Sequence, residues 1–124
     1  MRYVVSNADN VDIKHLQNNI LQARKNAEAT LQPFRENIEF HKLLAKASKN
    51  QVFVIMLDSI MAVVADFFSR LEPEFEVSVK VIDKHEAILS AIILRDASKA
   101  TSLLEEHIRD VGKRFHKISD YLTQ

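Results

Sequence analysis

Apolar residues recur every three or four positions along most of this chain, which is the spacing of the buried face of an α-helix. The pattern predicts five helices, at about residues 11–29, 33–49, 51–71, 76–94 and 96–122. Each apolar face has to be buried against another helix to be shielded from water. We therefore predict an all-α fold, an antiparallel bundle of about five to six helices that forms a single domain over residues 1–124.

Polar residues mark where these helices begin and end. Asp9 or Asn10 suits the N-cap of the first helix, and Asp96 suits the N-cap of the last. Asn50 can end the second helix in the left-handed conformation. The segment 51–71 is apolar on nearly all sides, which predicts a central position in the bundle.

The composition agrees with helices and narrows the class of protein. A single glycine leaves few sites for the positive-φ turns that β and Rossmann-like folds need. With 17 basic and 17 acidic side chains, the basic surplus of a nucleic-acid or anionic-membrane binder is missing. The absence of cysteine excludes thiol chemistry and favours a reducing cytoplasm. The longest apolar runs, 52–57 and 60–65, are too short to span a bilayer.

Three of the five histidines lie on the apolar stripes of three different predicted helices. His41 is three residues from both Ile38 and Leu44. His85 and His107 keep the same helical spacing to apolar neighbours, whereas the other two histidines fall off the stripes. Each of the three imidazoles is therefore expected to point toward the interior of the bundle.

A buried imidazole needs partners for both ring nitrogens, and leaving it unpaired costs about 1–3 kcal/mol. One such residue alone is best explained as a hydrogen-bonded core histidine. Three of them on separate helices could instead share one divalent ion, with Asn37 beside them because it lies one helical turn before His41. Spacing alone leaves both interpretations open, a metal site and a core of hydrogen-bonded histidines.

Several enzyme motifs are missing. No inward histidine is preceded at the third position by glutamate, as a di-iron bundle requires, and Leu89 stands where the second histidine of an HExxH helix would be. A three-histidine ion with an open position could still activate water as a hydrolase. Because no motif places a general acid or base, we do not expect an enzyme.

Four segments, in order and at suitable intervals, resemble the FadR C-terminal domain (FCD) of GntR-type bacterial transcription regulators, in its metal-binding branch. They are Asn37-Ile38-Glu39-Phe40-His41, the stretch 43–50, His85 to Ile92 with the pattern H-x-A-I-L-x-A-I, and Asp96-Ala97 with Ala100 followed by Glu106-His107-Ile108. The resemblance covers about residues 6–120.

The resemblance implies a divalent metal, zinc first and nickel or manganese as alternatives, at the floor of a pocket for a small organic acid. The ligand roles would fall on Asn37, His41, His85 and His107. It also implies a homodimer in the cytoplasm that acts on DNA through a winged-helix domain. No such domain is recognisable here, so these residues are not expected to bind DNA themselves, and no membrane contact is expected.

Three departures from the family pattern bear on function. Asn37 stands where many members carry aspartate, so the ion would keep its full charge and should bind a carboxylate effector directly. Arg95 stands where many have a helix-ending glycine. The family's opening helix with its R-x-x-L-E element is missing, because Met1–Val5 is too short to supply it. Arg24 or Arg35 could replace its anion contact, although a surface position suits both.

Overall fold

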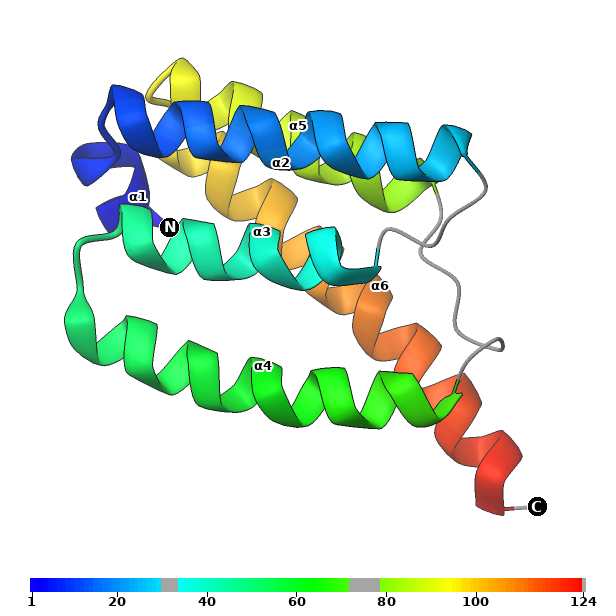
Figure 1. Ribbon diagram of the computed structural model, residues 1–124. Helices are drawn as coiled ribbons and strands as arrows, with labels where there is room; N and C mark the ends of the chain where they lie inside the picture. The colour runs from blue at the N-terminus through cyan, green and yellow to red at the C-terminus, as the bar shows by residue number, and fades with distance from the viewer. Residues whose placement is uncertain (30–33, 72–78, 124) are drawn as a thin grey trace.

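The computed structural model describes residues 1–29, 34–71 and 79–123, with side chains described except at 34, 64–71, 111–112 and 114–123. This part of the chain forms six helices and confirms the all-α prediction: α1 (Arg2–Asn7), α2 (Asn10–Glu28), α3 (Phe34–Ala47), α4 (Gln51–Leu71), α5 (Val79–Ile93) and α6 (Ala97–Thr123). From α2 onward, successive helices run in opposite directions (Figure 1). No helix in these ranges is long and apolar enough to cross a membrane.

The helices form an antiparallel bundle in which α3 and α5 pack against the most neighbouring helices. Helix α2 packs against both α3 and α5, and α6 runs along α5 (Figure 1). The short helix α1 closes one end, where it touches α3, α5 and α6. The sequence pattern missed α1, since six residues are too few to show a helical period. Its Val4 and Val5 are nevertheless buried in the core.

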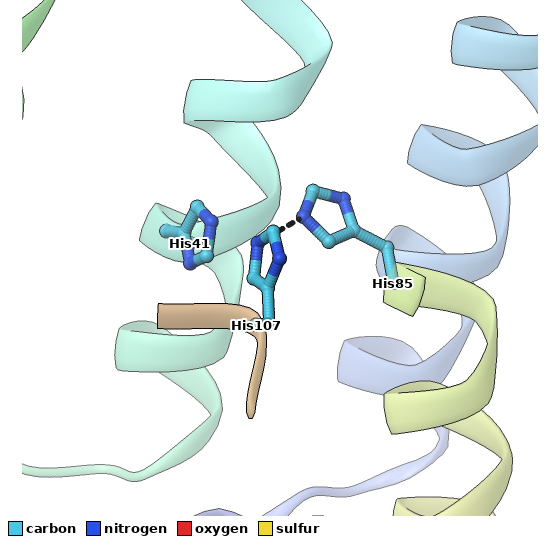
Figure 2. Close-up of side chains that lie close together, drawn as sticks. All are labelled: His41, His85 and His107. Carbon is cyan, nitrogen blue, oxygen red and sulfur yellow. Dashed lines mark hydrogen bonds between the residues drawn. The ribbon is translucent and has the colours of Figure 1, made fainter. Parts of the chain in front are cut away.

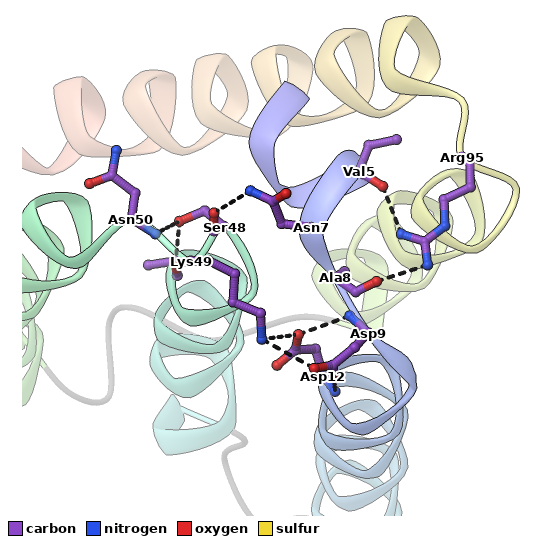
Figure 3. A network of polar contacts seen from close by, with 10 residues as sticks. Val5, Asn7, Ala8, Asp9, Asp12, Ser48, Lys49, Asn50 and Arg95 are labelled. Atoms are coloured by element: carbon purple, nitrogen blue, oxygen red, sulfur yellow. Dashed lines mark hydrogen bonds and ion pairs between the residues drawn. The ribbon is translucent and has the colours of Figure 1, made fainter.

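Helix α2 begins at the predicted cap. The Asp9 carboxylate accepts from the Asp12 backbone N–H at 2.8 Å, and the Asp12 carboxylate accepts from the Asp9 N–H at 3.0 Å. This reciprocal pair satisfies two of the free N–H groups of the first turn. Lys49, at the end of α3, reaches the Asp12 carboxylate at 2.6 Å and so joins α3 to the start of α2 (Figure 3).

The prediction that Asn50 ends the second helix in the left-handed conformation is wrong. Lys49 holds that conformation, with φ of 61°. Asn50 instead starts the next helix, because its Oδ1 accepts from the Phe53 N–H at 3.2 Å. An asparagine suits both roles, and the first turn of α4 takes its side chain as a cap.

Arg95 makes the corner between α5 and α6. Its φ is 58°, the left-handed value for which glycine is the usual residue. Backbone bonds from Arg95 to Ile92 at 3.0 Å and from Asp96 to Ala91 at 2.9 Å end α5. The Asp96 carboxylate then accepts from the Lys99 N–H at 3.1 Å, as predicted for the cap of α6. The arginine side chain also makes contacts that glycine could not make, since its guanidinium donates to the carbonyls of two residues of the N-terminal segment.

The main core lies between α2, α3 and α5. Leu16, Phe40, Ile88 and Ile92 are its largest fully buried apolar side chains. The prediction that the segment 51–71 occupies the centre of the bundle is wrong: within the described residues, α4 packs against α3 alone and lies at the edge (Figure 1). Its outer face leaves apolar side chains in water, with Val52 at 66% and Val63 at 70% exposure. Apolar content alone therefore did not identify a central helix.

Candidate metal centre

Three imidazoles from three helices meet inside the bundle. His41 comes from α3, His85 from α5 and His107 from α6 (Figure 2). The Nε2 atoms of His85 and His107 face each other at 3.1 Å, and one potential ligand nitrogen from each of the three rings lies within 4.8 Å of the others. Ring centroids are 5.2 Å apart for His41 and His85 and 5.4 Å for His41 and His107.

The separation between His85 and His107 suits a shared cation. Zinc–nitrogen bonds of about 2.0–2.1 Å in a tetrahedron place two ligand nitrogens about 3.3 Å apart, close to the observed 3.1 Å between His85 and His107. Without an ion, that contact is a hydrogen bond in which one neutral ring donates and the other accepts. Both lone pairs could face a metal instead, so the same side chains can adopt either state.

The surroundings keep the three rings neutral. Burial, and then the neighbouring His107, lowers the pKa of His41 to about 4. Burial, and then the other two rings, lowers the pKa of His85 to about 2. Burial, helped by the positive charge of Lys84, lowers the pKa of His107. Neutral imidazole is the form that binds metal, so no proton has to leave these rings at neutral pH.

Phe40 fixes the ring of His85. The two rings are stacked with centroids 4.0 Å apart and planes within 6°. Phe40 is fully buried and is the residue before His41, so one turn of α3 supplies both a histidine and the platform for another. The sequence shows Phe40 only as part of a motif, because the position of Phe40 on its helix does not reveal a partner on α5.

Asn37 has an oxygen that lacks a partner. It lies on α3 one turn before His41, and its buried Oδ1 accepts no hydrogen bond within the part of the chain that the structure describes. An unsatisfied buried carbonyl oxygen costs about 1–3 kcal/mol. A cation held nearby would remove that cost, so the amide fits the donor set of a metal site as a neutral oxygen ligand.

An ion pair lies beside the histidines. Lys84 of α5 pairs with Asp110 of α6, and the hydrogen bond from this lysine lowers the pKa of the Asp110 carboxyl. Lys84 is the residue before His85, and Asp110 lies three residues, or about one helical turn, after His107. The pair ties α5 to α6 at the level of the rings without adding net charge.

A pocket of about 250 Å³ opens onto His41 and His107. It lies between α3, α4 and α6, with the N-terminal segment closing one side. Apart from the two imidazoles, the described side chains that line it are apolar and include the buried or half-buried Val4, Leu44, Leu57, Met61 and Leu104. The exposed rim contains Phe53 and Ile108. A ligand in this space would lie directly against two of the three histidines.

The two arginines considered as anion contacts lie elsewhere. Arg24 of α2 pairs with Asp83 at 2.9 Å and with Glu86, both on α5. Arg35 lines a polar groove between α2 and α3 together with His15, which is exposed. Neither arginine lines the pocket at the histidines. The structure thus brings together His41, His85 and His107 and places both arginines outside that group.

Comparison with known proteins gives one result. The family model described as the FCD domain matches residues 1–110. The match therefore includes all of α1, most of which lies ahead of the stretch 6–120 that carries the sequence resemblance. Neither the curated proteins nor the solved structures contain a match to the chain. Because the matched stretch spans most of its length and all three histidines, the chain belongs to the FCD domain family.

Proposed function

We propose that this domain senses a small organic acid through one divalent metal ion held by Asn37, His41, His85 and His107. The observation that carries the proposal is the convergence of three neutral imidazoles whose ligand nitrogens lie within 4.8 Å of one another. The unpartnered Oδ1 of Asn37 supports a fourth ligand. Zinc suits this nitrogen-rich set best, with nickel or manganese as alternatives.

When bound, the ion would offer an anionic oxygen an attractive open position, because three imidazoles and one amide leave its charge uncompensated. The chain supplies the rest of the site. The three rings would hold the ion beside the pocket, and the stacked Phe40 supports the ring of His85. The apolar walls exclude water, which strengthens the attraction between opposite charges.

The biological role follows from the family. FCD domains belong to transcription regulators, and in the GntR group they respond to an effector. We propose that this domain does the same as a homodimer and reaches DNA only through a winged-helix domain. The exposed apolar face of α4 supports self-association, as does a net charge of zero. The proposal does not include catalysis, since no general acid or base is assigned to the centre.

Metal analysis of purified protein, followed by calorimetry, tests this function. We expect one zinc ion per chain after loading, with the affinity reduced at least about a hundredfold by His85→Gln because a ligand is lost. His15→Gln is the matched control, since His15 is exposed and outside the cluster. Binding of a carboxylate should require the loaded metal.

Two results would contradict the proposal. If the protein takes up no divalent metal, the three rings are a hydrogen-bonded core and the sensor mechanism fails. If metal binds but the loaded protein hydrolyses esters or amides, and His85→Gln abolishes that turnover, the site is catalytic.

A further inference from the structure

The pocket beside the histidines has an unusual lining for a carboxylate site. Among the described residues that line it, only His41 and His107 have polar side chains, and both are candidate metal ligands. None of the lining residues described is an arginine, lysine, serine or threonine. A second carboxylate or a row of hydroxyl groups would therefore enter this space without a hydrogen-bond partner, which is strongly unfavourable.

We infer that the effector is a monocarboxylate with an apolar tail, bound with its carboxylate toward the three-histidine centre and its tail between α4 and α6. This inference rests on the proposed function, because no described lining residue has a cationic side chain and the metal would supply the positive charge for the carboxylate. It goes further by excluding di- and tricarboxylates and sugar acids as the preferred effectors.

Helix α4 supplies the wall for the tail. Phe53, Leu57 and Met61 recur at intervals of four residues and all line the pocket. Leu104 of α6 lies one helical turn before His107 and lines the pocket too, so apolar surface begins directly beside a candidate ligand. The tail would thus meet aliphatic side chains as soon as it leaves the centre.

The volume limits the length of the tail. At about 30 Å³ for each non-hydrogen atom, the packing of liquid water, a space of about 250 Å³ holds a ligand of about eight such atoms. Hexanoate has that size. The exposed Phe53 and Ile108 at the rim mark where such a ligand would enter.

Calorimetry with zinc-loaded protein and three compounds of equal size tests the inference. Hexanoate carries one carboxylate and a tail, succinate carries two carboxylates, and hexanamide has the tail without the charge. We expect hexanoate to bind at least about tenfold more tightly than either of the others. Tighter binding of succinate, or equal binding of hexanamide, would overturn the inference.

A change in the wall should alter the preference. Leu57→Arg places a cation in the pocket, and we expect it to weaken hexanoate and strengthen succinate by about tenfold each. Ser59→Arg is the matched control, since Ser59 is exposed on the same helix and outside the pocket lining. Thermal unfolding of both variants checks that they fold, and an unchanged preference in a folded Leu57→Arg protein would also overturn the inference.

The outcomes separate the two proposals. If zinc fails to bind, the proposed function has failed and the choice of effector has no basis. If zinc binds and depends on His85, but succinate binds best or none of the three compounds binds, the metal centre stands and the apolar effector is wrong.

Discussion

Asn37, as a proposed metal ligand, would determine how much of the ion's charge remains for an effector. It lies one helical turn before His41, and its buried amide oxygen has no hydrogen-bond partner among the described residues. An aspartate there would neutralise part of the ion's charge, whereas the amide does not. The chemical difference is a single charge in a site with little water.

We expect Asn37→Asp to bind zinc more tightly and carboxylates more weakly than the natural chain. Unit charges about 4 Å apart interact by about 4 kcal/mol at an effective dielectric constant near 20. Desolvation offsets part of this, so about tenfold in each direction is a fair expectation. Calorimetric titrations with zinc and with a carboxylate measure the two changes in affinity. Asn18→Asp on the exposed face of α2 is the control, and the same response in both variants would remove Asn37 from the ligand set.

At the scale of elements, the left-handed corner at Arg95 connects three helices. Its guanidinium donates to the carbonyls of Val5 at 2.7 Å and Ala8 at 2.8 Å, so a residue between α5 and α6 holds the end of α1 (Figure 3). Asn7 adds a bond to the Ser48 carbonyl at 2.9 Å beyond the end of α3. Arg95 thus combines an unfavourable backbone conformation with side-chain contacts that stabilise a neighbouring element.

Two substitutions separate the backbone and side-chain contributions of Arg95. Arg95→Ala loses both hydrogen bonds and keeps the left-handed conformation, and we expect it to lower the free energy of unfolding by about 2 kcal/mol. Arg95→Gly loses the same bonds but relieves the backbone, so it should be more stable than Arg95→Ala by about 1 kcal/mol. Urea unfolding measures both. Identical midpoints for the two variants would mean that position 95 does not adopt a positive φ.

The sequence predicted the helices better than their arrangement. The bounds of α2 and α4 agree with the predicted ranges to within a residue or so, because polar caps such as Asp9 and long periodic runs define a helix locally. The edge position of α4 depends on how the apolar faces of the other helices pair with one another, and the sequence of α4 alone does not show this pairing. For the same reason, the three histidines could be assigned to inward stripes, but the stacking of Phe40 on His85 could not be predicted.

For the whole molecule, the buried rings make stability depend on pH. The folded chain lowers the pKa of His41 to about 4 from the ordinary value of 6.5, while the unfolded chain keeps the ordinary value. As the pH falls below 6.5 the unfolded state therefore takes up protons first, and the folded state loses stability until its own rings protonate. The contribution is fully present above pH 6.5.

Chelator-treated protein should accordingly lose stability between pH 6.5 and 4, on the order of 3 kcal/mol from His41 alone. Two carboxyl groups affect stability only at lower pH. A hydrogen bond from the Asp12 backbone lowers the pKa of Asp9 from 3.8, and one from Lys84 lowers the pKa of Asp110 from 3.8. Their contributions to stability are therefore lost only below pH 3.8. Urea titrations at a series of pH values measure the effect. His85→Gln should show a shallower dependence, and a flat profile down to pH 4.5 would contradict this account.

The attachment of α4 along one side has a consequence for selectivity. A pocket enclosed on every side by packed helices rejects any ligand that is one methylene too long, because the walls cannot yield. Here one wall belongs to a helix that packs against α3 alone within the described residues. We expect this wall to move outward for longer ligands. In a homologous series of acids, the affinity should therefore level off beyond the best-fitting chain length and not fall sharply.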